Sequence, residues 1–401
     1  MKPDSAVEII GELRNSGHEA YLVGGCVRDM VMGLEPADYD IATSARPEQI
    51  VSMFPRTENI GAQFGVILVI FRGHPFEVAT FRSDEAYVDG RRPTGVVFTD
   101  AKQDVLRRDF TINGLLYDPV GKQVIDYVGG RKDIEAKLVR AIGDPRARFE
   151  EDKLRILRAI RFGARLEYHI ESATWEAVRA MAPAIHQVSS ERIREELSRI
   201  LTEGQAARGM RLLEESGLRR QILPELEWTG HIEKSLGFLK KGSEADFAMG
   251  VLFHHAAVSS VEKIVERLKC SRAEMQHIIA LVENLPRFSG IRQMSTASLK
   301  RFFRLNRFED LVELARIHCI AAGEDLADLN YVLRKRADWT DGDICPAPLI
   351  TGDDLIAMGF APGPLFKDIL MRVEEEQLEG RLSDRAAAVD LVKRDYGPKS
   401  S

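Results

Sequence analysis

Hydrophobic residues follow two different patterns along the chain, and the change between them falls near residue 147. Up to about residue 140, short apolar or alternating runs bounded by Gly and Pro predict strands, as in AYLV, DYDIAT, VILVIF, FEVATF and VIDYV. From Ala147 onward, apolar positions recur at helical spacing and strand signals nearly vanish. The pattern therefore predicts an α+β fold, in which a mixed N-terminal part precedes an all-helical remainder.

A glycine pair and two carboxylates follow the first predicted strand. Gly24 and Gly25 end the run YLVGG, and Asp38 and Asp40 lie thirteen and fifteen residues after Gly25. Alternate strand residues share a face, so both carboxylates of DYDIAT are expected to point the same way. Carboxylate oxygens suit Mg²⁺, which keeps its other positions for water and substrate phosphates. Because the glycines let the backbone approach a triphosphate, the segment predicts a nucleotidyl-transfer site.

Glu77 is a third candidate carboxylate, in the strand-like stretch PFEVATFR. On a strand beside Asp38 and Asp40 it would complete or support the metal site. The alternative is an edge-strand glutamate that faces solvent, and both interpretations remain open at this point.

A second polar block, RRDFTIN, begins at Arg107 and Arg108. Adjacent arginines can hold triphosphate oxygens in fork geometry, and Asp109 or Asn113 can bond to a ribose hydroxyl. A charged helix start is the alternative, since Asp109 and Thr111 would cap a helix well. The density of specialised polar groups favours a nucleotide-binding role.

The segment GDPRARFEEDKLRILRAIRFGARL predicts a helix, with its lead-in, that carries many arginines. Its apolar stripe consists of Leu154, Leu157, Ile160 and Ala164. The arginines are Arg146, Arg148, Arg155, Arg158, Arg161 and Arg165.

Asp152 and Arg155 are three residues apart, which makes them neighbours on a helix surface. Asp152 can only accept and Arg155 can only donate, so the pair suits the amine and ring nitrogen of cytosine or adenine. Uracil and guanine place a carbonyl where Asp152 needs a donor, and each unpaired buried group costs about 1–3 kcal/mol. The alternative is an exposed salt bridge worth about 0.2–0.5 kcal/mol.

Composition limits the class of protein. The 401 residues are 44% hydrophobic and 29% charged, which predicts a globular, soluble chain. No apolar run approaches the roughly 20 residues that span a bilayer, and the N-terminus predicts an amphipathic helix rather than a signal peptide. We therefore expect no membrane partner. The four cysteines lack metal-ligand spacing, which favours a reducing cytoplasm and argues against a disulfide or zinc framework. With a net charge of −6, any nucleic acid must meet a local basic face.

Together the three blocks resemble the class II CCA-adding tRNA nucleotidyltransferases of the DNA polymerase β superfamily. The matching segments are LVGGCVRD, DYDIAT, FRSDEAYVDGRRPTGVVF, RRDFTING, VIDYVGGRKDI, RFEEDKLRILRAIRF and VSSERIREEL. They cover residues 20–200 densely, and PLITGDDLIAMGFAPGPLFKDIL matches more loosely. The resemblance implies a polymerase-β-like head with a mixed sheet at 1–142, and a helical neck with the base-recognition helix at 143–220. A helical body at 221–340 and a tRNA-binding helical tail at 341–401 would follow.

The resemblance also implies roles for individual residues. Asp38 and Asp40 would hold the metals of a two-metal reaction, Asp152 and Arg155 would read the incoming base, and Glu151 would brace that pair. Nucleotide contacts would come from Arg28, Arg108, Arg158 and Arg161. Residues 82–95 would form the loop that changes the site from C to A. The implied activity is template-independent addition of CCA from CTP and ATP, with Mg²⁺, to a tRNA held at its acceptor end and elbow.

Two departures from the family pattern stand out. Some relatives carry a His-Asp phosphohydrolase module, but VLFHHAAV contains His254 and His255 with no following Asp. We expect a core helix there, without hydrolase activity. Gly114 stands where Ala is usual in RRDFTINA, a small change.

The segment PRFSGIRQMSTASLKRFFRLNR combines basic and aromatic residues. It either tracks phosphates of a folded RNA or forms a solvated helix face over two core phenylalanines. Its relevant residues are Arg287, Arg292, Lys300, Arg301, Phe302, Phe303, Arg304 and Arg307.

Other functions remain open from the sequence alone. Enzymes that add only CC, only A or poly(A) share the motifs, although Lys153 replaces the Pro typical of the poly(A) polymerases, and the 82–95 loop has full length. A small-molecule nucleotidyltransferase would leave Asp152, Arg155 and the helical remainder unused. The intact carboxylates argue against a third hypothesis, that the chain is an RNA-binding protein without catalytic activity.

Overall fold

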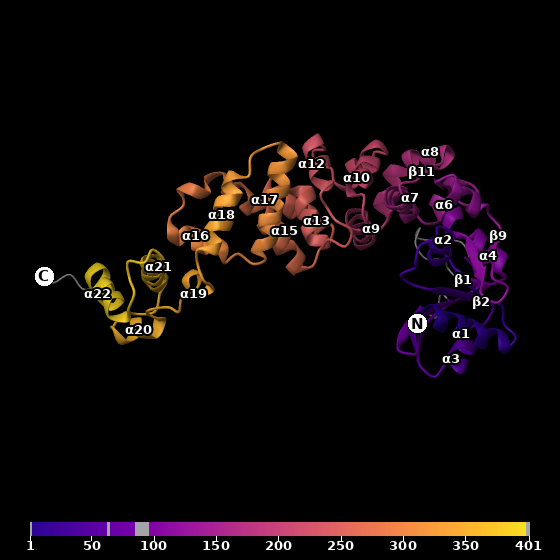
Figure 1. Ribbon diagram of the computed structural model, residues 1–401, viewed down its shortest axis with the longest axis horizontal. Coiled ribbons are helices and arrows are strands. Elements are labelled where there is room, and N and C mark those ends of the chain that lie inside the picture. The colour runs from indigo at the N-terminus through magenta and orange to yellow at the C-terminus, as the bar shows by residue number, and fades with distance from the viewer. Residues whose placement is uncertain (1, 62–64, 85–95, 398–401) are drawn as a thin grey trace. The chain divides into compact units, whose positions relative to one another are not determined.

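The computed structural model describes residues 2–61, 65–84 and 96–397 (Figure 1). Contacts divide the chain into two compact units, called here the N-terminal and the C-terminal unit. The first comprises Met1–Trp228, Leu239–Ala248 and Lys263–Cys270, and the second Thr229–Phe238, Met249–Glu262 and Ser271–Ser401. The predicted division into head, neck, body and tail is finer than this one and stays a prediction.

A seven-stranded mixed sheet organises the first part of the N-terminal unit, in the order β3-β4-β5-β2-β1-β8-β9. Strand β2 pairs in parallel with β5, and the remaining neighbours in this order are antiparallel. The strands are β1 (Ala20–Val23), β2 (Asp40–Thr43), β3 (Thr57–Gly61), β4 (Val66–Phe71), β5 (His74–Thr80), β8 (Leu115–Asp118) and β9 (Gln123–Asp126). Two smaller sheets pair β6 (Arg82–Asp84) with β7 (Val96–Phe98), and β10 (Leu138–Val139) with β11 (His169–Ile170). The mixed sheet confirms the predicted α+β class.

The helices of the N-terminal unit surround and follow this sheet. They are α1 (Lys2–Asn15), α2 (Gly25–Val31), α3 (Pro47–Met53), α4 (Ala101–Leu106), the 3-10 turn η2 (Thr111–Asn113), α5 (Gly130–Glu135), α6 (Pro145–Glu151), α7 (Leu154–Arg165), α8 (Ser172–Met181), η3 (Ala182–Gln187), α9 (Ser190–Thr202), α10 (Ala206–Glu215) and α11 (Leu218–Ile222). Strands β1 and β2 are central because their short apolar runs are buried on both faces. Val23 and Ala42 pack with Val105 of α4, while Leu22, which alternates to the opposite face, is equally buried.

Helix α7 packs against α9 and α10, and this packing continues the N-terminal unit beyond the sheet. Its buried residues include Leu157 and Ile160 of the predicted apolar stripe. The predicted single helix is in fact two, because α6 ends at Glu151 and α7 begins at Leu154. Asp152, the residue after α6, has extended backbone angles that break the helix.

The C-terminal unit is helical throughout its described residues. Its helices are α12 (Gly230–Leu236), α15 (Arg272–Asn284), η4 (Leu285–Gln293), α16 (Thr296–Phe303), α17 (Phe308–Ala322), α18 (Ala327–Ala337), α19 (Asp341–Ile344), α20 (Gly352–Ala357), α21 (Pro364–Leu378) and α22 (Arg385–Tyr396). Helices α13 (Ala245–Phe253) and α14 (Val258–Arg267) contribute residues to both units. Helices α20, α21 and α22 share a small core of their own around Leu355, Ile369 and Val392. Among the helices that the structure describes, none combines the length and the apolar character that crossing a bilayer requires.

The basic segment around α16 forms part of the fold of this unit. Phe302 and Phe303 are buried core residues, which agrees with the plain alternative. Arg301 and Arg304 both bind Glu374 of α21, at 2.9 and 2.6 Å. These arginines therefore help to hold α21 in place, and the single charge of Glu374 neutralises part of their combined charge.

Gly114 follows η2 in a confined space. A Cβ atom on this residue would lie 2.8 Å from Cγ2 of Val128 and 3.1 Å from Cδ1 of Ile142. Side-chain atoms in proteins rarely approach so closely. Gly114, in place of the Ala usual in the family, therefore leaves room for the side chains of Val128 and Ile142.

We expect Gly114→Ala to lower the free energy of unfolding by about 1–3 kcal/mol, because overpacking forces its neighbours to move. In Gly114→Ala/Val128→Ala the loss should be smaller than the sum of the two single losses, since the second change removes the clashing methyl group. Urea unfolding measures both. Gly11→Ala in α1, where a Cβ meets nothing within 4 Å, is the control and should be neutral or stabilising. A neutral Gly114→Ala would contradict the packing argument.

Candidate active site

A cavity of about 770 Å³ in the N-terminal unit collects most of the predicted site residues. The predicted residues that line it are Gly24, Gly25, Arg28, Asp38, Asp40, Arg107, Arg108, Asp109, Asn113, Asp152, Arg155, Arg158 and Arg161. Among its described lining residues, nine are arginines and five are carboxylates. This local excess of positive charge, in a chain of net charge −6, suits a polyanionic ligand.

The glycine pair brings the backbone close to the cavity. Gly24 has φ +77°, a conformation that residues with a Cβ rarely adopt. A Cβ there would lie 3.4 Å from the guanidinium of Arg108, which also lines the cavity. Gly25 begins α2, so the turn leads directly from β1 into a helix.

The two predicted metal ligands lie at the start of β2. Asp40 is its first residue, but Asp38 precedes the strand, so the expected strand DYDIAT is two residues too long at its N-terminal end. Asp38 is 80% exposed and accepts a hydrogen bond from Nζ of Lys2 at 2.8 Å. Lys2 also donates to the backbone oxygen of Ala37. The carboxylates therefore share the cavity, although they do not share one strand.

Burial raises the pKa of Asp40 to about 6, and the negative charges of Glu77 and Asp38 act in the same direction. Arg108 opposes them. Glu77 lies on β5, whose Val78 pairs in parallel with Ile41, so Glu77 and Asp40 occupy corresponding positions on neighbouring strands. Glu77 is exposed and lies outside the described lining of the cavity. The charges of Glu77 and Asp38 thus act on Asp40, and a hard cation would stabilise such a set of carboxylate oxygens.

Arg107 and Arg108 are held by one buried carboxylate. Asp104, in α4, is 1% exposed and binds Arg107 at 2.7 Å and Arg108 at 2.9 Å. Burial by itself raises the pKa of Asp104, but the two guanidinium groups outweigh it, so this pKa is lowered and the carboxylate is charged. The two arginines expected to bind phosphate are thus oriented by the buried carboxylate of Asp104.

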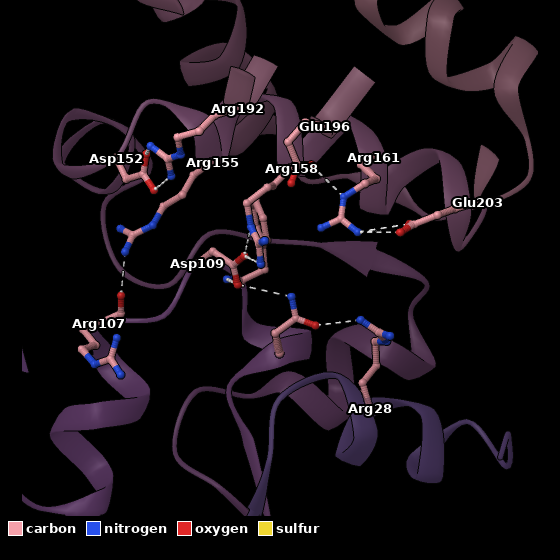
Figure 2. Close-up of polar contacts among 12 residues, drawn as sticks. Arg28, Arg107, Asp109, Asp152, Arg155, Arg158, Arg161, Arg192, Glu196 and Glu203 are labelled. Atoms are coloured by element: carbon pink, nitrogen blue, oxygen red, sulfur yellow. Dashed lines mark hydrogen bonds and ion pairs between the residues drawn. The ribbon is translucent and has the colours of Figure 1, made fainter. Parts of the chain in front are cut away.

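A chain of hydrogen bonds along the cavity wall leads from Arg158 through Asp109 to Arg28 (Figure 2). Arg158 binds Asp109 through Nε and Nη2 at 2.7 and 2.6 Å, and Nδ2 of Asn113 donates to Asp109 at 3.2 Å. Oδ1 of Asn113 then accepts from Arg28, which also binds Asp29 at 2.6 Å. Burial by itself raises the pKa of Asp109, but Arg158 outweighs it and the pKa falls to about 2. The network fixes groups from η2, α2 and α7 in one arrangement.

Asp152 does not pair with Arg155 as a salt bridge between helix neighbours would. Both of its oxygens instead accept from Arg192 of α9, at 3.1 and 2.9 Å (Figure 2). The backbone N–H of Leu154 donates to Oδ1 as well. A carboxylate has about four acceptor positions, so Asp152 is oriented and still has capacity for another donor.

Arg155 is held by three acceptors around the α6–α7 break. Nη1 donates to the backbone oxygen of Arg148 and to Glu151 at 2.7 Å, and Nη2 donates to the backbone oxygen of Arg107 at 2.9 Å. Glu151 lies outside the described lining of the cavity and also binds Arg148. A guanidinium has five N–H groups, so these bonds orient Arg155 and leave donors for a ligand.

Helix α9 contributes residues that sequence reasoning missed. Arg192, Arg199 and Glu203 line the cavity, and Arg161 binds Glu196 at 2.8 Å and Glu203 at 3.1 Å (Figure 2). Together with the buried Glu196 these residues recur every three or four positions, on a face adjacent to that of the buried Ile193, Leu197 and Ile200. This polar stripe was visible in the sequence, but only its spacing distinguishes it from an ordinary solvated face.

The predicted loop at 82–95 is described only at its ends. Residues 82–84 belong to β6, which pairs with β7, and residues 85–95 lie outside the described part of the chain.

Two family models match the chain, and close relatives extend the likeness to nearly its whole length. The poly A polymerase head domain matches residues 20–140, and the probable RNA and SrmB-binding site of polymerase A matches residues 167–229. The CCA-adding enzyme of Bacillus licheniformis is 32% identical over 394 residues, which cover 96% of each chain. That of Geobacillus stearothermophilus is 41% identical over 225 residues, 55% of each chain. A crystal structure of the Bacillus stearothermophilus CCA-adding enzyme in complex with CTP matches with a TM-score of 0.82, at 28% identity over 98% of each chain.

The lowered pKa of Asp109 predicts a pH dependence of stability. Its folded pKa of about 2 lies below the ordinary 3.8, so its contribution is complete well above pH 4 and disappears as the pH falls through 2. The difference in free energy of unfolding between wild type and Asp109→Asn should shrink by about 1 kcal/mol between pH 5 and pH 3. Urea unfolding at each pH measures it. The exposed Glu135→Gln is the control, and a difference for Asp109→Asn that does not change with pH would exclude the ion pair as its cause.

Proposed function

The chain belongs to the family of the CCA-adding enzymes, the tRNA nucleotidyltransferases, and we propose that it adds C, C and A to tRNA 3′ ends from CTP and ATP. One cavity supports this proposal. It combines the carboxylates of Asp38 and Asp40, a wall rich in arginine, and an acceptor and a donor for a nucleotide base, Asp152 and Arg155. A small-molecule nucleotidyltransferase would need the first two features only. The cytoplasm is the proposed location, because it holds these nucleotides and tRNA.

The reaction transfers a nucleotidyl group to the tRNA. The 3′-hydroxyl oxygen forms a bond to the α-phosphorus of CTP or ATP, the bond to the β-phosphate oxygen breaks, and pyrophosphate leaves. Nucleotidyltransferases of this fold use a divalent metal, and we propose Mg²⁺ held by Asp38 and Asp40. When bound, the metal lowers the pKa of the attacking hydroxyl and offsets negative charge on the triphosphate.

The repulsion around Asp40 supports a metal at this place. Burial raises the pKa of Asp40 most, and the negative charges of Glu77 and Asp38 raise it further, so a cation bound there would relieve this repulsion. We assign Glu77 a supporting role, through its negative charge, because it stands on the neighbouring strand and outside the described cavity lining.

The arginines bind and orient the triphosphate in this proposal. Arg108 stands beside the Gly24 turn, and Arg107 shares with it the brace from Asp104. Because Asp104 neutralises only part of their combined charge, the pair retains attraction for phosphate oxygens. Arg28 and Asn113 are tied to Asp109, and they stand ready to contact the nucleotide with little reorganisation.

Asp152 and Arg155 select the base. Asp152 accepts from the amine of cytosine or adenine, and Arg155 donates to the adjacent ring nitrogen. Arg192 holds Asp152, and Glu151 holds Arg155, so each reading group is fixed by a separate partner. A rigid reading pair makes the carbonyl of uracil or guanine costly, since neither side chain can turn away.

Asp40→Ala should reduce incorporation of both C and A by about a thousand-fold or more, because a metal ligand in the transition state is worth several kcal/mol. Binding of tRNA and the circular dichroism spectrum should remain near those of wild type. Incorporation of labelled CTP and ATP onto tRNAs that lack the CCA end provides the measurement. The exposed Glu135→Ala of α5 is the matched control and should keep full activity. Near-normal turnover of Asp40→Ala would disprove the metal assignment.

Asp152→Asn should relax the discrimination against UTP by about tenfold or more, because the new amide donor can face the uracil carbonyl. The measurement is kcat/KM for all four nucleotides on one tRNA acceptor. Arg155→Ala should lower kcat/KM for both CTP and ATP, since each loses its donor at the ring edge.

Arg192→Ala serves as the comparison for this pair. It loosens Asp152 without adding a donor, so it should weaken incorporation of C and A with no gain for U. An equal loss for every nucleotide in Asp152→Asn would assign the pair a structural role only. The same assay on acceptors ending before the first C, or after CC, distinguishes CCA addition from CC-only, A-only and poly(A) addition.

A further inference from the structure

Four histidines meet in the C-terminal unit, far apart in sequence. His231 lies in α12, His254 and His255 directly follow α13, and His318 lies in α17. One nitrogen of each ring can be chosen so that all four atoms lie within 4.8 Å of one another. Ring centroids of the six pairs are 4.3–5.4 Å apart. Four imidazoles packed in this way are an unusual concentration of nitrogen ligands.

The environment fixes the orientation of the buried member. Nδ1 of His254 donates to the backbone oxygen of Val251 at 2.6 Å. Because one ring nitrogen carries this proton, Nε2 of the neutral ring presents its lone pair to the cluster. That atom lies 3.2 Å from Nε2 of His231. A histidine whose far nitrogen donates to a backbone carbonyl has the usual arrangement of a metal ligand.

A second observation comes from His318. Its Nδ1 is buried and has no hydrogen-bond partner among the described residues. His318 also lines a cavity of about 770 Å³ together with His254 and His255. A buried nitrogen without a partner destabilises a fold, and a metal ion bound by this ring would offset that cost.

We propose that His231, His254, His255 and His318 bind one divalent transition-metal ion, and that Zn²⁺ is the ion they fit best. Imidazole suits Zn²⁺, and four nitrogen ligands complete a tetrahedral shell. With Zn–N distances near 2.1 Å, neighbouring ligand nitrogens in a tetrahedron are about 3.4 Å apart. The 3.2 Å separation of the two Nε2 atoms already matches this value.

The metal would have a structural effect rather than a catalytic one. Four protein ligands leave no open position for water, and the ligand set contains no carboxylate. Helices α12 and α17 already pack against each other (Figure 1). The ion would add a link from both of them to the turn after α13. The core helix expected through VLFHHAAV is therefore wrong at His254 and His255, which lie beyond the end of the helix. Helix α13 ends at Phe253, and His255 is exposed.

The test uses the full chain carrying Asp40→Ala, so that metal at the catalytic carboxylates does not contribute. The protein is freed of metal with a chelator, loaded with Zn²⁺ and desalted, and its zinc is measured by mass spectrometry. About one Zn²⁺ per chain is expected, with a rise in Tm on loading. Loading with Co²⁺ instead should give the intense visible absorption of a tetrahedral site.

Single variants assign the ligands. His255→Ala and His318→Ala should each reduce retained zinc at least about tenfold and abolish the rise in Tm. His255 is exposed, so its replacement leaves the fold intact. His169→Ala, an exposed histidine in β11 outside the cluster, is the matched control and should retain zinc. Equal zinc in the cluster variants and the control, no retained zinc in the parent chain, or a weak octahedral Co²⁺ spectrum would each overturn the proposal.

Discussion

Buried carboxylates hold the arginines of the cavity in place, and the geometry of the site depends on this balance. Without such partners, nine guanidinium groups around one cavity would repel one another and turn into solvent. Asp104 holds Arg107 and Arg108, Asp109 holds Arg158, and Glu196 holds Arg161. Each carboxylate fixes the direction of its arginines, and the nine arginines of the described lining still outnumber its five carboxylates. The cavity is therefore preorganised for an anion before any ligand enters.

The α6–α7 break shows how much the sequence could reveal. The sequence singled out Asp152 and Arg155 as a pair of acceptor and donor, and both line the cavity, although their role in reading the base stays a prediction. Their support was not predictable, because Arg192 comes from α9, 40 residues away from Asp152. The helical spacing also indicated one continuous helix, whereas Asp152 ends α6. Local sequence patterns indicate which side chains are candidates for the site, but tertiary packing determines which residues they contact.

The same distinction applies to the fold. The mixed sheet followed by helices was predicted from the change of hydrophobic period and is confirmed. The strand bounds were less accurate at Asp38, since alternation alone does not determine where pairing begins. The four histidines form no local motif, because His254 lies 23 positions after His231, and α14, α15, η4 and α16 lie between His255 and His318. Only the packing of α12 against α17 makes the cluster apparent.

The contact between Lys2 and Asp38 places a cation that belongs to the protein on the carboxylate expected to bind metal. A tethered ammonium is present at a constant effective concentration, whereas a dissolved cation acts at whatever concentration the surroundings provide. An ion pair this exposed is weak, so a divalent ion bound at Asp38 as proposed would displace it readily. Lys2 is the first described residue of α1, and its release would free the start of that helix. If Asp38 binds a metal as proposed, it would exchange one counterion for another, and the start of α1 would lose its contact with Asp38 when the metal binds.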